Sequence, residues 1–333
     1  MVVLLLVGLT FGLLSSCSKI QDSTIQQDST TALVSPTEEN DNLVSDVPLD
    51  EQLVIYAPAS SSSIPVILAA RKLENAELQL YTNQSQANTL FLRGEVDILV
   101  TGLSVGVDLY SNGAPVQMIS SYVSGLSYLV TYGKQVTSLS ELKGESVYVP
   151  FEGSPIEQVM QFLVEKQGLN WKTDVKPVYS PFESSIELLK QGTAAAVILP
   201  EPNVALVEGQ PNIYVSLDLF DEWNKETGST QGYPQVAVFA RPDWTAANSE
   251  MINAFNQALS EAVEYVQQEP EAALTEVQSN YKLPAEKLAK ALSRTRYFFM
   301  SGEQMQSAVE NYYQTIGKPL DETFADFYFI TAQ

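Results

Sequence analysis

Short apolar runs alternate with amphipathic stretches in the part of the chain that follows a polar N-terminal region. Residues 52–57, 78–81 and 96–100 form mostly apolar runs of strand length, which predict buried strands. Residues 64–73 and 87–93 repeat their apolar positions at helical spacing, and the second of these stretches ends at a glycine. The alternation of strand and helix at this spacing predicts a parallel α/β sheet.

A second set of alternating elements follows. It comprises a short capped helical turn, three strands and two helices, at residues 138–144, 146–149, 155–167, 175–179, 184–191 and 194–199. Residues 93–101 of the first set align with residues 191–199 of the second, since each segment has a helix end, a glycine, a buried strand and a polar exit. Two lobes of like construction would produce this echo, and so would chance similarity between βα units.

The last third of the chain is predicted to be helical from residue 249 onward, after a strand at 233–240. The expected helices lie at residues 251–268, 270–280, 284–294 and 302–316. In the first of them, Ile252, Phe255 and Leu259 follow the three- and four-residue spacing of a single helix face. That helix is therefore expected to bury one side in the core.

The N-terminal segment has the features of an export signal. Residues 1–14 are almost wholly apolar, which is too short a run to span a bilayer core of about 30 Å as a helix. Two serines and Cys17, the one cysteine of the chain, follow. This arrangement resembles the lipobox of bacterial lipoproteins and implies a signal peptide at 1–16 and a diacylglycerol on Cys17. The alternative is a chance cysteine near a buried strand.

The segment between this cysteine and the first strand is rich in Ser, Thr, Gln, Asp, Glu and Asn. With so few large apolar residues it cannot bury enough surface to fold, so residues 17–50 are expected to form a lipidated, disordered tether. The predicted protein therefore lies outside the cytoplasm, attached to the membrane by acyl chains.

Composition removes several classes of function. The 333 residues include no histidine and one cysteine, and 18 Lys and Arg stand against 40 Asp and Glu, giving a net charge of −22. Without His there is no Ser-His-Asp triad and no His-ligated metal. One cysteine permits no internal disulfide, and the negative charge disfavours nucleic acid as a partner. No cofactor motif or catalytic constellation stands out, so the chain is not expected to be an enzyme.

Several segments together resemble one family. They lie at residues 139–150, 152–156, 162–168, 188–192 and 199–202. They are similar to the solute-binding lipoproteins of ABC importers in the nitrate, taurine and alkanesulfonate group, which includes binders of pyrimidine thiamine precursors and of riboflavin. The sequence departs from the group at Ala195, where an Asp is frequent.

The resemblance implies a type II periplasmic-binding-protein fold, an α/β architecture of two lobes joined by a two-strand hinge with the ligand cleft between them. The first lobe is expected at residues 51–135 plus 235–333 and the second at 136–234. The chain is expected to cross between the lobes near 132–135 and 232–234.

Ligands of open α/β sheets bind beyond the carboxyl ends of the strands, where polar loops and helix N-termini gather. Candidate ligand-binding residues in these loops, with one tyrosine that could stack on a flat ligand, are Ser60, Ser61, Ser62, Ser63, Asn83, Gln84, Ser85, Thr101, Gly102, Tyr122, Gly153, Ser154 and Glu201. Each has a plainer alternative: a helix cap, a turn, a core side chain or, for Glu201, an exposed surface charge.

The loops that form the expected cleft contain no Arg, Lys or His. This favours a neutral, hydrogen-bonding and heteroaromatic ligand, while a sulfonate or similar anion held by backbone N–H groups stays open. The function expected is the extracytoplasmic solute-binding component of an ABC importer: a monomer that closes on a small molecule and delivers it to permease subunits. The alternatives are an enzyme of pyrimidine or menaquinone precursor synthesis on the same fold, or a ligand-sensing surface lipoprotein.

Overall fold

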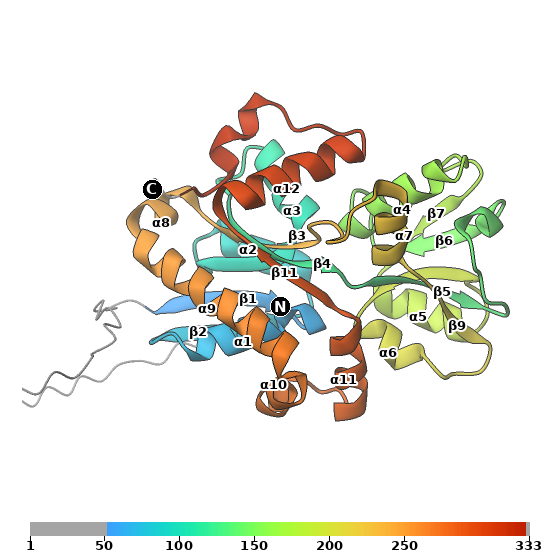
Figure 1. Ribbon diagram of the computed structural model, residues 1–333, viewed down its shortest axis with the longest axis horizontal. Helices are drawn as coiled ribbons and strands as arrows, with labels where there is room; N and C mark the ends of the chain where they lie inside the picture. Colours follow the sequence, from blue (N-terminus) through green and yellow to red (C-terminus); the bar gives the residue numbers. More distant parts are fainter. Residues whose placement is uncertain (1–51, 331–333) are drawn as a thin grey trace, which may run out of the picture. The chain divides into compact units, whose positions relative to one another are not determined.

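The computed structural model describes residues 52–330, and in this part of the chain the strands form two mixed sheets (Figure 1). The six-stranded sheet has the order β11-β4-β10-β3-β1-β2 and comprises β1 (Leu53–Pro58), β2 (Ala76–Tyr81), β3 (Ile98–Gly102), β4 (Gln117–Gly125), β10 (Val236–Ala240) and β11 (Arg296–Met300). β1 pairs in parallel with β2 and β3, which confirms the parallel sheet expected there. β10 and β11 pair in the antiparallel direction, so the complete sheet is mixed.

The five-stranded sheet has the order β7-β6-β8-β5-β9. It comprises β5 (Ser127–Tyr132), β6 (Ser146–Val149), β7 (Lys176–Tyr179), β8 (Ala196–Pro200) and β9 (Ile213–Asp218). β6 lies parallel to both β7 and β8, whereas β5 runs antiparallel to β8 and β9. The three strands predicted for this part of the chain are present, and β5 and β9 are additional.

The chain passes between the two sheets at Leu126, the residue between β4 and β5, and again at residues 228–235. The first passage lies earlier than the sequence placed it, because residues 117–132 form two consecutive strands that belong to different sheets. Residues 132–135 follow the end of β5, where Tyr132 pairs with Ile213. We call residues 52–125 and 236–330 lobe I and residues 127–227 lobe II.

Helices cover both faces of each sheet (Figure 1). Those of lobe I are α1 (Ile64–Arg71), α2 (Gln84–Leu92), α3 (Leu103–Ser111), α8 (Pro242–Ala247), α9 (Ser249–Gln268), α10 (Pro270–Val277), α11 (Ala285–Arg294) and α12 (Gly302–Thr315), with 3₁₀ turns η1 (Ser61–Ser63), η3 (Gln278–Asn280) and η4 (Glu322–Phe327). Those of lobe II are α4 (Pro155–Lys166), α5 (Phe182–Lys190), α6 (Asn203–Val207) and α7 (Leu219–Thr227), with η2 (Leu139–Leu142).

The C-terminal region departs from the all-helical prediction at β11. The run Arg-Tyr-Phe-Phe-Met is short and rich in aromatic side chains, which favour a strand. It pairs antiparallel with β4, and Tyr297 packs into the core together with residues of α9. The predicted helices on either side of it, α11 and α12, are confirmed.

The core consists of three apolar clusters, as this layering requires. One fills the α2 and α3 face of the six-stranded sheet and continues to the α4 and α7 face of lobe II. A second lies under α1, α9 and α10, and a third lies between the five-stranded sheet and α5 and α6. None of the helices between residues 52 and 330 has the length and apolar character needed to cross a membrane. The predicted signal peptide, Cys17 and the tether lie outside the described residues.

Candidate functional site

A cavity of about 180 Å³ lies between the lobes, beyond the carboxyl ends of strands from both sheets. Lobe I contributes the ends of β1 and β3, the start of α2, and η1. Lobe II contributes the ends of β6 and β8 and the N-termini of α4 and α5. Leu126 and Gln235 line it from the two passages between the sheets. This is the position at which α/β sheets commonly bind ligands.

The lobe I wall carries a hydrogen-bonded group of neutral side chains. The Gln84 amide oxygen accepts a hydrogen bond from the Tyr81 hydroxyl at 3.0 Å and one from the Thr101 hydroxyl at 3.0 Å. The Gln84 amide nitrogen donates to Asn88 at 2.6 Å, which fixes the orientation of the amide. Burial raises the pKa of Tyr81 above its ordinary value of 10.0, so its hydroxyl stays protonated at neutral pH.

The serine run of η1 divides between the cavity and the interior of lobe I. Ser60 and Ser62 line the cavity, and their hydroxyls are hydrogen-bonded to each other at 2.6 Å. The Ser61 hydroxyl is bonded to that of Thr295 at 2.7 Å, and the Ser63 hydroxyl donates to the Pro58 carbonyl. Two of the four predicted serines therefore reach the cavity, while the other two hold η1 against lobe I.

The lobe II wall is built on the N-terminus of α4. Ser154 lines the cavity and caps the helix, because its hydroxyl accepts a hydrogen bond from the Glu157 N–H at 3.1 Å. The buried Glu157 carboxylate accepts three bonds, from the Gly153 N–H at 2.6 Å, from the Trp171 indole at 3.1 Å and from the Tyr179 hydroxyl at 2.7 Å. Glu157 thus fixes the loop that leads into Ser154.

Aromatic and aliphatic side chains complete the lining. The lining residues not expected from the sequence are Val105, Phe151, Ile156, Phe182 and Val236, four prolines (Pro58, Pro150, Pro155 and Pro200), and Tyr81, Leu126 and Gln235. The Gln235 amide oxygen accepts from the Leu126 N–H at 3.2 Å, and its amide nitrogen donates to Ser127 at 2.7 Å, so it ties the two passages together. The pattern Ser-x-x-Glu at 154–157 is a capping-box signature that could have identified Glu157.

The two walls come into close contact at one point. A Cβ atom on Gly102, at the end of β3, would lie 2.8 Å from Cγ of Pro155 in the first turn of α4. Gly102 has an ordinary φ of −63°, so the backbone itself does not require glycine. The absence of a side chain here instead allows lobe I to approach lobe II this closely.

Four predicted contacts lie elsewhere. Asn83 caps α2, since its side chain accepts a bond from the Gln86 N–H at 3.0 Å, and Ser85 is exposed on the same helix. Tyr122 is wholly buried in the core beneath α1 and α9. Gly153 precedes the helix cap with a φ of +79°, and its N–H bonds to Glu157. The plainer roles of cap, core and turn describe these residues.

Glu201 is also turned away from the cavity. Its side chain is 0% exposed and forms an ion pair with Arg294 of α11, at 3.2 Å. The carboxylate also accepts the Ala205 N–H at 3.1 Å, and Arg294 binds Glu208 at 2.6 Å. Burial raises the pKa of Glu201, with the Ala205 N–H and Arg294 acting in the opposite direction. A buried carboxylate needs a partner, and a lobe I arginine supplies it.

Residues 52–330 contain no group of three or more His, Cys, Asp or Glu side chains placed to bind a metal ion. The cavity lining likewise includes no Asp, Glu, Lys, Arg or His. The arrangement offers a neutral, partly open cavity between two lobes, able to hold a small molecule by contact and hydrogen bonding.

The chain matches the model of one protein family, described as NMT1/THI5 like, over residues 71–273. No curated protein sequence matches it significantly. Its fold is similar to that of the periplasmic aliphatic sulphonate binding protein SsuA from Escherichia coli, at 18% identity and a TM-score of 0.69, covering 85% of this chain and 93% of that one.

Two further solved structures are similar. The alkanesulfonate-binding protein SsuA from Xanthomonas axonopodis pv. citri, bound to MOPS, has 13% identity and a TM-score of 0.64, covering 81% of this chain and 94% of its own. The periplasmic nitrate-binding protein NrtA from Synechocystis PCC 6803 has 14% identity and a TM-score of 0.60, covering 76% and 74%. The fold class expected from the sequence is thereby confirmed. Because the family match spans more than half of the chain, the protein belongs to the NMT1/THI5-like family and has the two-lobed fold of periplasmic binding proteins.

Proposed function

We propose that the protein captures a small organic molecule between its lobes and delivers it to the permease of an ABC importer. The observation that carries this proposal is the cavity itself, which both lobes and both passages line at the carboxyl ends of the strands. The similar structures include an aliphatic sulphonate binding protein and a nitrate-binding protein, which supports a binding role over an enzymatic one.

Capture works by closure. A ligand shifts the equilibrium toward the closed form only through contacts that the open form lacks. Here those contacts come from the lobe II residues Phe151, Ser154 and Phe182, which face the lobe I residues Gln84 and Thr101 across the cavity. Gly102 and Pro155 form one of the contacts between the lobes, and we propose that their close approach is needed for full closure at this cavity.

The ligand is proposed to be uncharged. An ion buried in this cavity would find no oppositely charged side chain in the lining, and burying an unpaired charge costs several kcal/mol. The N-terminus of α4 would be the natural place for an anion, but the Glu157 carboxylate already lies there and accepts the Gly153 N–H. A second negative group at this helix end would be repelled.

The ligand is also proposed to be small and flat. The cavity of about 180 Å³ has the room of roughly six water molecules at about 30 Å³ each. Phe151 and Phe182 bring aromatic rings to the lining, and the Ser60, Ser62 and Thr101 hydroxyls bring hydrogen-bonding groups. A single heteroaromatic ring with polar substituents can pack against the aromatic side chains and form hydrogen bonds with the hydroxyl groups.

The N-terminal sequence indicates the place of action. Cleavage after residue 16 and acylation of Cys17 would anchor the protein to the outer side of the cell membrane, and residues 18–50 would hold the lobes away from it. The proposed partners are the membrane and the permease subunits, with the binding protein acting as a monomer.

The test is a thermal unfolding and calorimetric screen of the purified protein against two sets of compounds. The neutral set is uracil, cytosine, nicotinamide and the hydroxymethylpyrimidine precursor of thiamine; the anionic set is taurine, ethanesulfonate and nitrate. We expect a neutral ring to raise Tm and to bind in calorimetry, as selective binding to the native state requires. Binding of an anion instead would contradict the proposed ligand class.

Two variants locate the binding. Gly102→Trp fills the cavity from the end of β3 and is expected to abolish both the rise in Tm and the binding seen by calorimetry. Asn83→Ala removes a helix cap outside the cavity and is expected to leave the affinity unchanged. Equal affinity in wild type and Gly102→Trp would place the ligand elsewhere and contradict the site.

A further inference from the structure

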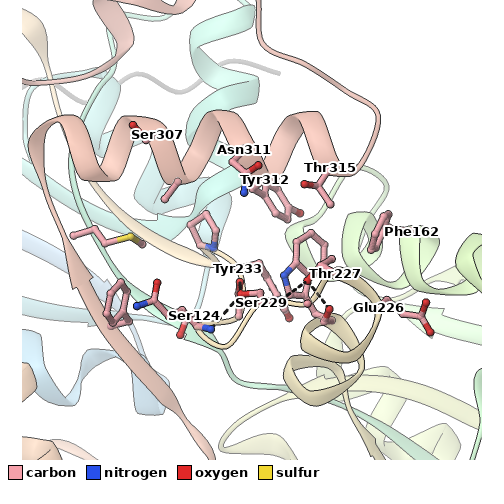
Figure 2. A pocket seen from close by; sticks show the side chains of 18 of the residues that line it. Ser124, Phe162, Glu226, Thr227, Ser229, Tyr233, Ser307, Asn311, Tyr312 and Thr315 are labelled. Atoms are coloured by element: carbon pink, nitrogen blue, oxygen red, sulfur yellow. Dashed lines mark hydrogen bonds between the residues drawn. The ribbon is translucent and has the colours of Figure 1, made fainter.

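A second and larger cavity, of about 640 Å³, lies on the other side of the passages between the sheets (Figure 2). Its walls come from β11 and α12 of lobe I, from α4 and α7 of lobe II, and from the second passage. Its lining shares no residue with that of the cavity described above. Nothing in the proposed capture mechanism uses it.

The chain itself separates the two cavities. In the second passage, Tyr233 and Pro234 line the larger cavity, and Gln235, the next residue, lines the smaller one. Helix α4 likewise reaches both, with Ser154 at its N-terminus in the smaller cavity and Phe162, two turns later, in the larger. The two spaces therefore lie on opposite sides of the hinge.

One wall of the larger cavity is an aromatic group built around Trp223. The Trp223 ring centroid lies 5.0 Å from that of Phe162, 5.2 Å from that of Tyr233 and 5.5 Å from that of Tyr312. Tyr233 and Tyr312 are stacked at 6.1 Å. These rings come from α4, α7, α12 and the second passage. They pack on one another and are each at most 6% exposed, so they form a rigid group of which only the edges border the cavity.

Another part of the lining, on α12, offers unused hydrogen-bonding groups. Ser307, Asn311 and Thr315 lie four residues apart on α12, which places them on one face of the helix, and Figure 2 shows their side chains along the cavity. Within residues 52–330 none of these three side chains makes a hydrogen bond to the protein. By contrast, the Thr227 hydroxyl is occupied, since it donates to the Trp223 carbonyl at 2.8 Å and accepts the Ser229 N–H.

The charges at this cavity balance, in a chain whose net charge is −22. Its lining contains one acid, Glu226, and one base, Lys166. Glu226 accepts a bond from Gln167 at 2.7 Å, and the Lys166 ammonium lies 5.2 Å from the Phe162 ring centroid. Both charged groups therefore already have partners, and the remaining groups are hydroxyls, amides and rings.

We propose that the larger cavity binds a neutral polyhydroxylated molecule of disaccharide size. Its C–H groups would lie against the ring edges around Trp223 that border the cavity, and its hydroxyls would bond to Ser307, Asn311 and Thr315. The volume is in the range of about 300–1,000 Å³ that small-molecule sites occupy. β11 and α12, which form its lobe I wall, follow residue 273, where the family match ends.

Binding there is coupled to closure, because the occupant touches both lobes on the far side of the hinge. The lobes are already in contact beside this cavity, where the Trp223 ring of α7 lies 5.5 Å from the Tyr312 ring of α12. The Tyr312 hydroxyl also donates to Gln158 of α4, at 3.3 Å, in a buried bond between the two lobes. An occupant of the larger cavity therefore favours the closed form, and by linkage closure strengthens its binding.

The experiment titrates the purified chain, with no ligand for the smaller cavity, with trehalose, sucrose and maltose. Binding is followed by calorimetry and by tryptophan fluorescence, since Trp223 lies in the wall of the site. We expect saturable binding of at least one sugar with a Kd at or below about 1 mM. Ala308→Trp, which fills the cavity from α12, should abolish it, and Asn311→Ala should weaken it several-fold.

The matched control is Ala272→Trp, which places the same side chain on an exposed position of α10 and should bind the sugar as wild type does. Gly102→Ala, which hinders closure, should weaken sugar binding several-fold. The site is contradicted if no sugar binds saturably, or if Ala308→Trp and Asn311→Ala both respond as wild type does. Unchanged sugar affinity in Gly102→Ala contradicts the coupling. Because the smaller cavity is empty throughout, these results are independent of the ligand proposed for it.

Discussion

Strand β3 of lobe I and strand β8 of lobe II are preceded by the same pattern of residues, but the residues at their C-terminal ends have different roles. β3 and β8 are each interior strands of their sheets, and each comes after a helix that stops at a glycine of positive φ, Gly94 at +80° and Gly192 at +71°. At the end of β3, Thr101 and Gly102 line the cavity between the lobes. Beyond β8, Glu201 is buried against Arg294.

The difference shows that the position of a strand and the use of its exit are decided by different residues. The helix–glycine–strand pattern places both exits at the same edge of their sheets. The residues at the end of the strand or directly after it then decide its role: small neutral groups remain available to a ligand, whereas a buried carboxylate pairs with a nearby cation. The exit of β3 thus forms a binding wall, and the exit of β8 ties lobe II to lobe I.

The largest expected effect comes from breaking the ion pair between Glu201 of lobe II and Arg294 of lobe I. Arg294→Ala leaves Glu201 buried without its cation, so we expect a loss of about 3–5 kcal/mol in the free energy of unfolding, measured by urea denaturation at pH 7. Arg71→Ala removes an exposed lobe I arginine and should cost far less. If Arg294→Ala lowers the free energy of unfolding no more than Arg71→Ala does, the ion pair between Glu201 and Arg294 does not stabilise the protein.

The next effect tests the other exit. Gly102→Ala should lower the affinity for the neutral ring identified in the screen by at least about tenfold, or about 1.4 kcal/mol, because the new Cβ meets Pro155 at 2.8 Å. The free energy of unfolding should change little, since φ is −63°. Adding Pro155→Ala removes the clashing Cγ and should restore part of the affinity in calorimetry. Failure of this rescue would contradict closure against Pro155.

A smaller effect compares two helix caps. Ser154→Ala and Asn83→Ala each remove a side-chain acceptor from a first-turn N–H, so each should cost about 1 kcal/mol of stability by thermal unfolding. Only Ser154 lines the cavity, so only its variant should also weaken ligand binding. Equal ligand affinities in the two variants would show that Ser154 does not contact the ligand.

The smallest effect is a pH dependence with opposite signs at two carboxylates that share Arg294. Burial raises the pKa of Glu201 above its ordinary value of 4.5, so its contribution to stability is greatest below about pH 4.5 and is lost as the pH rises through the raised value. Burial also acts upward on Glu208, but Arg294 and Lys290 outweigh it and lower the pKa, so its contribution is lost as the pH falls through the lowered value.

Urea denaturation at pH 4 and pH 7 measures this contrast in two variants. Relative to wild type, Glu201→Gln should gain stability as the pH rises, whereas Glu208→Gln should lose it. The same sign for both variants would contradict the assignment of the two carboxylates.

The sequence predicted the layered fold well, because short apolar runs and glycine stops mark most strands and helices locally. It did not predict the first passage at Leu126, since β4 and β5 form a nearly continuous extended segment and their division depends on pairing with distant strands. The prediction of an all-helical C-terminal region likewise missed β11, whose partner β4 lies far away in sequence.

The candidate site was predictable as a set of loops but not side chain by side chain. Gln84, Thr101 and Ser154 reach the cavity, yet their neighbours Ser85 and Gly153 do not, because one residue along a turn changes the direction of the side chain. Glu201 could not be assigned from its loop, since its partner Arg294 is brought to it only by the packing of α11 on α6.

The most direct test of two-lobe capture is native mass spectrometry of the wild-type protein and Gly102→Trp, each purified from the source organism. We predict that wild type retains one uncharged ring molecule per chain and that Gly102→Trp, whose cavity is filled, retains none. Retention of the same molecule by both proteins, or of an anion by wild type, would contradict two-lobe capture of a neutral ligand.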